Sequence, residues 1–140
     1  MVLGAHRSGT SALAGVIQRL GVELGENLLG PQAGVNERGF GEHSDLVALH
    51  DHLLGQLGSR WDSIHPLPEK WWQSSEIDSI SREISNVVER DFGNTKLWGL
   101  KDPRLCRLLP LWLNILEQRA CEPSFVIIYR NPLEVTASLS

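Results

Sequence analysis

Apolar side chains recur at helical spacing in three stretches of the chain. In residues 9–20, 43–57 and 75–91 they lie three and four residues apart, which places them on one face of a helix. The apolar positions are Leu13, Val16, Ile17 and Leu20 in the first stretch, Leu46, Leu49, Leu53 and Leu57 in the second, and Ile77, Ile80, Ile84, Val87 and Val88 in the third. We predict a helix over each stretch.

Three shorter runs are mostly apolar and are typical of buried strands. They cover residues 1–4, 97–100 and 125–129, and the last of them, Phe-Val-Ile-Ile-Tyr, has the clearest pattern. Strands that alternate with helices form α/β domains with a mainly parallel sheet. The sequence therefore predicts one α/β domain over residues 1–140.

Proline marks two predicted boundaries in the C-terminal part of the chain. Pro110 is expected to divide the segment around it into a turn and a helix over residues 110–119. Further on, Asn131 is placed to cap a last helix whose first residue is Pro132, and Glu134 is placed to complete a capping box.

Two long segments lack either pattern and are predicted to be loops. Residues 21–42 are rich in Gly, Asn and Pro, and loops of that length in a compact domain usually have a function. Residues 58–73 carry Trp61, Trp71 and Trp72. We interpret these tryptophans as core residues in preference to the lining of a binding pocket.

Composition and charge narrow the classes of partner. The formal net charge is -4, so no general positive field attracts nucleic acid. No apolar run approaches the roughly 20 residues that span a bilayer, and the N-terminus lacks a signal-peptide pattern, so we expect a cytoplasmic location. Two cysteines do not indicate a disulfide framework. Both ends break off inside predicted elements, which indicates a partial sequence.

Residues 4–11, Gly-Ala-His-Arg-Ser-Gly-Thr-Ser, lie between a predicted strand and a predicted helix. Backbone N–H groups at a helix N-terminus bind anions, and small residues let phosphate oxygens come close. Gly4 and Gly9 have the spacing of a nucleotide-binding P-loop. The following position is Thr10 where P-loop ATPases have lysine, and the positive charge is at Arg7 instead.

This loop resembles the 5′-phosphosulfate loop of sulfotransferases that use 3′-phosphoadenosine 5′-phosphosulfate (PAPS), in the segment Arg7-Ser8-Gly9-Thr10-Ser11. A second motif of that family is an arginine at the end of a strand and a serine eight residues later, here Arg130 and Ser138. The resemblance implies a three-layer α/β/α fold of the P-loop type. It also implies that the first motif binds the 5′-phosphate and the second binds the 3′-phosphate. Ligands of such sheets bind at the carboxyl ends of strands, and an arginine offers phosphate a fork of donors.

The tetrad Lys101-Asp102-Pro103-Arg104 follows the predicted strand 97–100. It is similar to a Lys-Asp-Pro segment of some sulfotransferases, which implies that Lys101 acts at the sulfuryl group. We interpret Asp102 as a helix cap with Pro103 at the first helical position. Arg104 has three open interpretations, which are contact with the acceptor, contact with the nucleotide, or support of a carboxylate.

Sulfuryl transfer to a hydroxyl or amine usually needs a base for the acceptor proton. Residues 39–42, Gly-Phe-Gly-Glu, resemble a Gly-aromatic-x-Glu segment of bacterial members of the family, and this resemblance favours Glu42 as the base. The other candidates are Glu26, Glu37, His43 and His50. His6, beside Arg7, is a candidate to line the same pocket.

The resemblance implies a PAPS-dependent sulfotransferase that needs no metal, with a small-molecule, carbohydrate or lipid acceptor. Arg7 and Lys101 would offset charge as the S–O bond breaks. The first alternative is a P-loop kinase or ATPase, which the missing lysine and the ending of strand 125–129 in Tyr-Arg disfavour. The second is a non-catalytic nucleotide-binding fragment, because the family completes its nucleotide site downstream of the serine.

Overall fold

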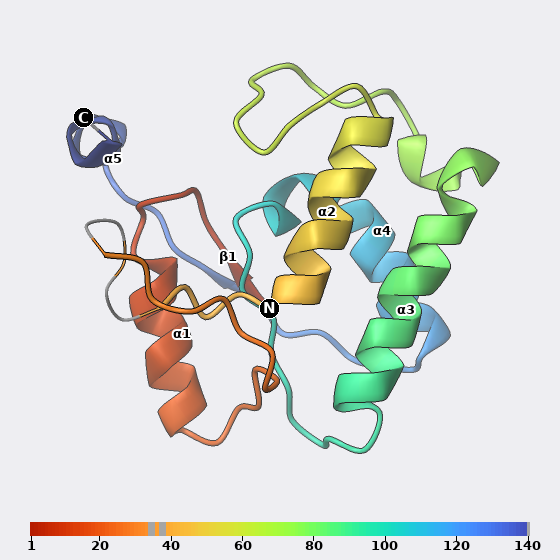
Figure 1. The fold of residues 1–140 in the computed structure, drawn as a ribbon, viewed down its shortest axis with the longest axis horizontal. Helices are drawn as coiled ribbons and strands as arrows, with labels where there is room; N and C mark the ends of the chain where they lie inside the picture. The colour runs from red at the N-terminus through yellow and green to blue at the C-terminus, as the bar shows by residue number, and fades with distance from the viewer. Residues whose placement is uncertain (34–35, 37–38, 140) are drawn as a thin grey trace.

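The computed structural model describes residues 1–33, 36 and 39–139 and combines helices with a small parallel sheet (Figure 1). The main elements are β1 Val2–Leu3, α1 Thr10–Arg19, α2 Ser44–Gln56, α3 Asp78–Phe92, α4 Leu105–Gln118, β2 Val126–Ile127 and α5 Pro132–Leu139, with 3-10 turns at Trp71–Gln73 and Ser75–Ile77. Among the helices of this described part, none is both long and apolar enough to cross a membrane.

The sheet consists of β1 and β2, which run parallel with Val2 opposite Val126. On the other side of β1, the backbone N–H of Val2 donates to the carbonyl of Leu100 over 2.9 Å. The run 97–100 was predicted as a strand and makes only isolated bridges at its ends, from Trp98 to Glu23 and from Lys101 to Val2. The prediction of a regular strand is therefore wrong. The segment around Glu23 and the strand β1 each form a single bridge here, and a regular strand needs consecutive ones.

Helices lie on both sides of these paired segments (Figure 1). Leu3 and Leu100 belong to the main core, which they share with α2, α3 and α4. Gly99 faces the opposite side, where a Cβ atom would lie 2.9 Å from the side chain of Val22. α1 contacts β1 and lies apart from the other three helices (Figure 1). The strand segments therefore separate a large helical core from the single helix α1.

The predicted helices α2 and α3 are confirmed, and their apolar faces build the main core. Their fully or nearly fully buried residues are Leu46, Leu53 and Leu54 in α2 and Ile80, Ile84, Val88 and Phe92 in α3. α4 adds Trp112, which is completely buried. The 3.6-residue period was sufficient to predict these buried faces, because each helix packs on a continuous apolar surface.

α1 forms where predicted, but its predicted buried face is wrong. Val16 is 52% exposed and Leu20 is 75% exposed, whereas Ala14 is fully buried. The loop that precedes α2 passes directly over Ala14, since a Cβ atom on Gly41 would lie 3.0 Å from the Cβ of Ala14. Such a close approach favours a small residue, so α1 turns its alanine inward. Gly21 follows α1 with a φ of 92°, as a glycine helix stop requires.

The predicted break at Pro110 is also wrong, because α4 continues through this residue. A proline inside a helix leaves the carbonyl four residues earlier without its usual donor, and that residue is Cys106. Cys106 lies in the first turn of α4 and is exposed, so water can satisfy its carbonyl. The helix therefore tolerates the proline.

The run 125–129 was predicted to be the clearest buried strand, and its burial is wrong. Val126 is 45% exposed, Ile127 is 73% exposed and Tyr129 is 83% exposed. In the part of the chain that the structure describes, β2 pairs with β1 along one edge and with no strand along the other. An apolar composition indicates a strand but not which neighbours cover it.

From the main core we predict that two isoleucines differ greatly in how much they stabilise the fold. Ile84→Ala should lower the free energy of unfolding by about 2 to 5 kcal/mol, because it removes a fully buried side chain and leaves a cavity. Ile64 is 93% exposed, so Ile64→Ala should change it by less than about 0.5 kcal/mol. Urea unfolding followed by circular dichroism measures both. Equal effects of the two substitutions would contradict the described core.

Candidate functional site

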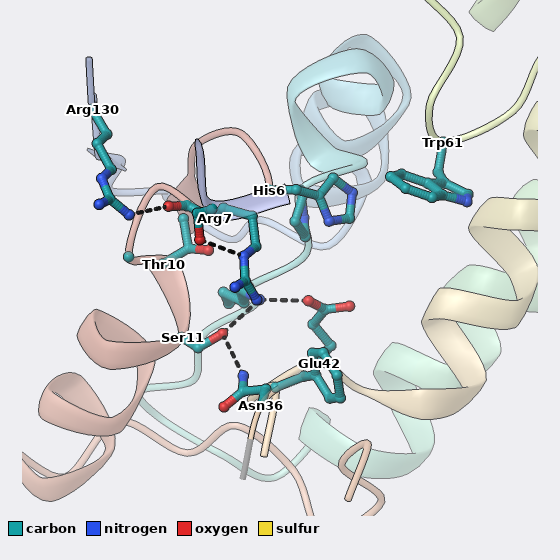
Figure 2. Close-up of a pocket in the computed structure, with 13 residues that line it drawn as sticks. His6, Arg7, Thr10, Ser11, Asn36, Glu42, Trp61 and Arg130 are labelled. Atoms are coloured by element: carbon teal, nitrogen blue, oxygen red, sulfur yellow. Dashed lines mark hydrogen bonds and ion pairs between the residues drawn. The ribbon is translucent and has the colours of Figure 1, made fainter. Parts of the chain in front are cut away.

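A pocket of about 710 Å³ lies where the phosphate-loop candidate, the Lys101 segment and the start of α5 come together (Figure 2). Eight of the nine site residues predicted from the sequence line it, namely Arg7, Gly9, Thr10, Ser11, Glu42, Lys101, Arg130 and Ser138. The ninth, Ser8, is buried within the loop. Residues from both ends of the chain thus share one cavity.

The loop between β1 and α1 is held in an unusual backbone conformation. Arg7 has a φ of 64° and Gly9 has a φ of 101°, so both lie in the left-handed region. This curvature brings the loop directly into the N-terminus of α1, where the first N–H groups have no acceptor within the helix. The loop therefore presents backbone donors and the partial positive charge of a helix terminus to the pocket.

Two small residues fix the shape of this loop. The hydroxyl of Ser8 donates to the carbonyl of Ala5 over 2.7 Å, so it closes the loop internally and does not point into the pocket. A Cβ atom on Gly4 would lie within 2.9 Å of the carbonyl of Ile128 and within 2.8 Å of the Thr10 side chain. Because the Ile128 carbonyl cannot move freely, only glycine fits there. Gly4 therefore lets the loop between β1 and α1 pack against the C-terminal strand segment.

Arg7, Arg130 and Ser138 are joined by hydrogen bonds (Figure 2). Nε of Arg7 donates to the hydroxyl of Ser138 over 2.9 Å, and Nη1 of Arg130 donates to the carbonyl of Arg7 over 3.0 Å. Nε of Arg130 also donates to Glu134 over 3.0 Å. The two predicted phosphate motifs therefore lie side by side, 123 residues apart in the chain for the Arg7–Arg130 contact.

The start of α5 agrees with the sequence prediction in part. The side-chain oxygen of Asn131 accepts the backbone N–H of Leu133 over 3.0 Å, which is the predicted cap. The capping-box role predicted for Glu134 is not what its side chain does, because its carboxylate pairs with Arg130. That ion pair aligns the arginine beside the loop.

Lys101 and Glu42 form a buried ion pair in the lining of the pocket. Nζ of Lys101 donates to Oε1 of Glu42 over 2.5 Å and to the hydroxyl of Ser11 over 3.2 Å. The amide of Asn36 donates to the same hydroxyl over 3.3 Å. Burial raises the pKa of Glu42 above its usual range, and the neighbouring Lys101 only partly offsets this rise.

A second layer of polar groups supports this pair from below. The indole N–H of Trp112 donates to Nε2 of His50 over 3.0 Å, so that nitrogen is an acceptor and carries no proton. Nδ1 of His50 therefore holds the proton and donates to Asp102 over 2.8 Å. Burial alone would raise the pKa of Asp102, but the hydrogen bond from His50 and the charge of Arg104 outweigh it and lower the pKa to about 2.

The structure distinguishes among the three interpretations of Arg104. Its guanidinium donates to Asp51 over 2.6 Å and to Asp102 over 3.0 Å, and it lies 3.7 Å from Glu42. Its backbone N–H donates to Asp102 over 2.9 Å, so Asp102 caps the turn that leads into α4. The prediction that the helix itself begins at Pro103 is wrong, because α4 begins at Leu105. Arg104 does not line the pocket and supports three carboxylates.

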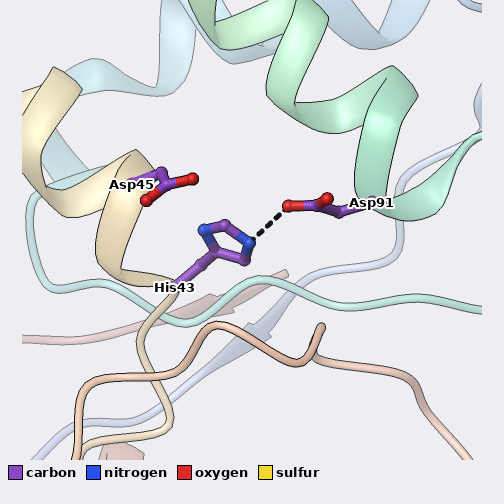
Figure 3. A group of neighbouring side chains, drawn as sticks. All are labelled: His43, Asp45 and Asp91. Carbon is purple, nitrogen blue, oxygen red and sulfur yellow. Dashed lines mark hydrogen bonds and ion pairs between the residues drawn. The ribbon is translucent and has the colours of Figure 1, made fainter.

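Of the other candidates for a base, those that the structure describes do not line this pocket. His50 faces Asp102, Glu26 lines a different pocket, and Glu37 lies outside the described residues. His43 is buried and bonds to Asp91 over 2.8 Å (Figure 3). Glu42 is therefore the predicted base that the structure brings to the pocket.

His43, Asp45 and Asp91 are near enough for a metal ion, with ligand atoms within 4.8 Å of one another (Figure 3). A cation is already present among them, because Nη2 of Arg90 donates to both carboxylates over 2.6 Å. Arg90 therefore neutralises much of the negative charge that would attract a metal.

Five further residues line the pocket: His6, Asn36, Phe40, Trp61 and Pro103. His6 fits the suggestion from the sequence, but the core position predicted for Trp61 is wrong, since this side chain is 44% exposed. Trp71 is a core residue as predicted, with 5% exposure. The two tryptophans differ in burial. Trp61 lies between charged neighbours in a loop, where no helical or strand periodicity indicates which side chains are buried.

Comparison with known proteins identifies no relative. No protein-family model matches the chain, and neither a curated protein nor a solved structure is significantly similar to it. The geometry and chemistry of the pocket are therefore the basis for inferring a function.

From the low pKa of Asp102 we predict that the free energy of unfolding depends on pH in a specific way. Its pKa is lower in the folded protein than the ordinary value of 3.8, so its contribution is present above pH 3.8 and is lost as the pH falls toward about 2. At pH 7, Asp102→Asn should lower the free energy of unfolding by at least about 2 kcal/mol. The difference from wild type should shrink between pH 4 and about pH 2.

The matched control is Asp62→Asn, since Asp62 is 46% exposed beside Arg60. Its effect should stay below about 1 kcal/mol at every pH. Chemical denaturation at a series of pH values measures both variants. An Asp102 effect that persists unchanged at pH 2 would refute the assigned role of its charge.

Proposed function

We propose that this chain binds PAPS and transfers its sulfuryl group to an acceptor hydroxyl or amine. The observation that supports this most strongly is the convergence of Arg7, Arg130 and Ser138 in one pocket. They come from opposite ends of the chain and meet beyond the carboxyl ends of two parallel strands. Ligands of parallel α/β sheets bind in that position.

The two phosphates of the nucleotide would be bound by different parts of the pocket. The N-terminus of α1 with Gly9, Thr10 and Ser11 suits the 5′-phosphate, because its backbone donors need an anion as acceptor. Arg130 and Ser138 suit the 3′-phosphate, since a guanidinium and a hydroxyl both donate to phosphate oxygens. The hydrogen bonds among these groups would then be exchanged for bonds to phosphate.

The transfer step is an in-line displacement at sulfur. The acceptor oxygen or nitrogen attacks the sulfur, and the bond from sulfur to the bridging oxygen of the 5′-phosphate breaks. The electron pair of that bond leaves with the nucleotide, and Glu42 takes the acceptor proton. Arg7 and Lys101 offset the negative charge that grows on the bridging and sulfuryl oxygens.

The Lys101–Glu42 pair links charge stabilisation to proton transfer. Its ammonium lies 2.5 Å from Glu42 and would be drawn toward an incoming sulfuryl group. As the ammonium moves away, the buried carboxylate loses its nearest positive charge. Burial then raises the pKa of Glu42 further, which makes it a stronger base when the acceptor is in place.

The proposal includes the finer features that the sequence resemblance implies. These are the three-layer α/β/α architecture of the P-loop type, of which the parallel pair β1 and β2 would form a part, and a cytoplasmic location. The acceptor classes remain small molecules, carbohydrates and lipids.

Nucleotide binding provides the first test. The product 3′-phosphoadenosine 5′-phosphate should bind without metal in isothermal calorimetry, more tightly than 5′-AMP or ATP with Mg²⁺. Arg130→Ala should weaken this binding about 10- to 100-fold, because a charge-assisted hydrogen bond to phosphate is lost. The matched control is Arg82→Ala, which removes an exposed arginine of α3 that does not line the pocket and should leave the affinity unchanged. Tighter binding of ATP with Mg²⁺ would favour a kinase or ATPase and refute the proposal.

Glu42→Gln tests the base. The substitution keeps an acceptor for Lys101 but removes the proton acceptor, so kcat for sulfuryl transfer should fall roughly 100- to 10,000-fold. In the wild type, kcat should rise with pH through a pKa above 4.5, since Glu42 must be ionised to act. Glu26→Gln, outside the pocket, is the control and should keep the wild-type profile. An unchanged pH profile in Glu42→Gln would exclude this residue as the base.

A further inference from the structure

Three aromatic side chains line the pocket, and two of them, His6 and Trp61, lie side by side. Trp61, His6 and Phe40 line the same cavity as the phosphate motifs, and Figure 2 shows Trp61 and His6 on the opposite side of Arg7 from Arg130. The centroids of the His6 and Trp61 rings lie 4.6 Å apart with a tilt of 59°. None of these rings is needed for the phosphate contacts proposed above.

The loop that carries Trp61 is fixed to α4 by one side chain. Arg107 donates to the carbonyl of Arg60 over 2.6 Å, to the hydroxyl of Ser59 over 3.0 Å and to the carbonyl of His65 over 2.9 Å. These bonds bracket Trp61 on both sides in the sequence. The indole therefore has a defined place above the pocket although it lies in a loop without regular structure.

Two features at this end of the pocket indicate a missing contact. The indole of Trp61 remains 44% exposed although its loop is anchored. Nε2 of His6 is buried and makes no hydrogen bond within the described part of the chain. Buried polar atoms of this kind are uncommon in folded proteins. Burial and the nearby Arg104 and Lys101 lower the pKa of His6, which favours the neutral ring, and Nε2 can then donate or accept one hydrogen bond according to the tautomer.

We infer that Trp61 and His6 form the acceptor subsite and that the acceptor is a carbohydrate. This inference rests on the sulfotransferase function proposed above. The C–H bonds on one face of a pyranose ring carry partial positive charge and suit the negative face of an indole. Its ring hydroxyls would find a polar partner in His6, whose ring lies beside the indole, and further polar groups in Asn36 and Glu42 of the same pocket.

The polarity of the surroundings favours a sugar over the other two acceptor classes. A lipid chain would need a continuous apolar channel, but the lining of this pocket also contains the amide of Asn36 and the Glu42–Lys101 pair. A phenol has one hydroxyl and would leave the other donors and acceptors without partners, which is costly in a desolvated pocket. A sugar supplies several hydroxyls together with an apolar face.

The experiment has two arms on the same protein samples. The first arm measures the affinity of wild type, Trp61→Ala, Trp61→Phe and Ile64→Ala for 3′-phosphoadenosine 5′-phosphate by calorimetry. The second arm measures binding of cellotriose, chitotriose, maltotriose, 4-nitrophenol and 1-decanol to the nucleotide-bound protein by saturation-transfer NMR. Ile64 is the matched control because it is an exposed apolar residue of the same loop that does not line the pocket.

We expect nucleotide affinity to agree within about twofold among all four proteins, because Trp61 lies away from the phosphate motifs. At least one trisaccharide should bind wild type and Ile64→Ala equally, bind Trp61→Ala roughly tenfold more weakly or not at all, and bind Trp61→Phe with intermediate affinity. The inference is overturned if no trisaccharide binds, if Trp61→Ala binds as wild type does, or if the phenol or the alcohol binds better than every sugar. Loss of nucleotide binding in wild type would instead refute the proposed function itself.

Discussion

The buried ion pair between Lys101 and Glu42 is the interaction around which the pocket is organised. Taking two charges out of water is costly, and their attraction compensates only when further hydrogen bonds satisfy the remaining donors and acceptors. Ser11 supplies one such bond to the lysine, and Arg104 lies close to the second oxygen of the carboxylate. The pair therefore ties three separate segments together, namely α1, the segment that precedes α2 and the segment that follows residues 97–100. Removing either partner would leave an uncompensated charge among all three.

Below this pair, Asp102 connects the pocket to the hydrophobic core. It caps the start of the α4 region, accepts a hydrogen bond from His50 and pairs with Arg104. His50 in turn accepts from Trp112, which is fully buried between the helices. The position of the pocket charges is therefore set by residues that never reach the pocket. This arrangement gives a rigid support to side chains that are proposed to act on a substrate.

The sequence predicted those parts of the structure that depend on local pattern. The faces of α2 and α3 follow from a 3.6-residue period, and six of the thirteen residues described as lining the pocket belong to two short motifs at the ends of strands. What could not be predicted depends on tertiary neighbours. Ala14 is buried in place of Val16 because a loop crosses α1 closely, and Ile127 is exposed because no strand pairs with the outer edge of β2 in the described chain. The exposure of Trp61 could not be predicted either, because Arg107 anchors its loop through bonds between residues 42 to 48 positions apart, which no local pattern reveals.

The contact between α5 and the loop that joins β1 to α1 has a thermodynamic consequence. α5 is mostly exposed, with Leu133 at 77%, and the bonds from Arg7 to Ser138 and from Arg130 to the Arg7 carbonyl are among those that hold it in place. A helix with so little buried surface opens at a small free-energy cost, and amide hydrogens in it exchange readily with solvent. An anion bound between Arg7 and Arg130 would stabilise the state in which α5 contacts the loop. It would therefore slow that exchange. Ligand affinity at this site would then include the free energy of ordering a helix, so mutations that loosen α5 would weaken binding without touching the ligand.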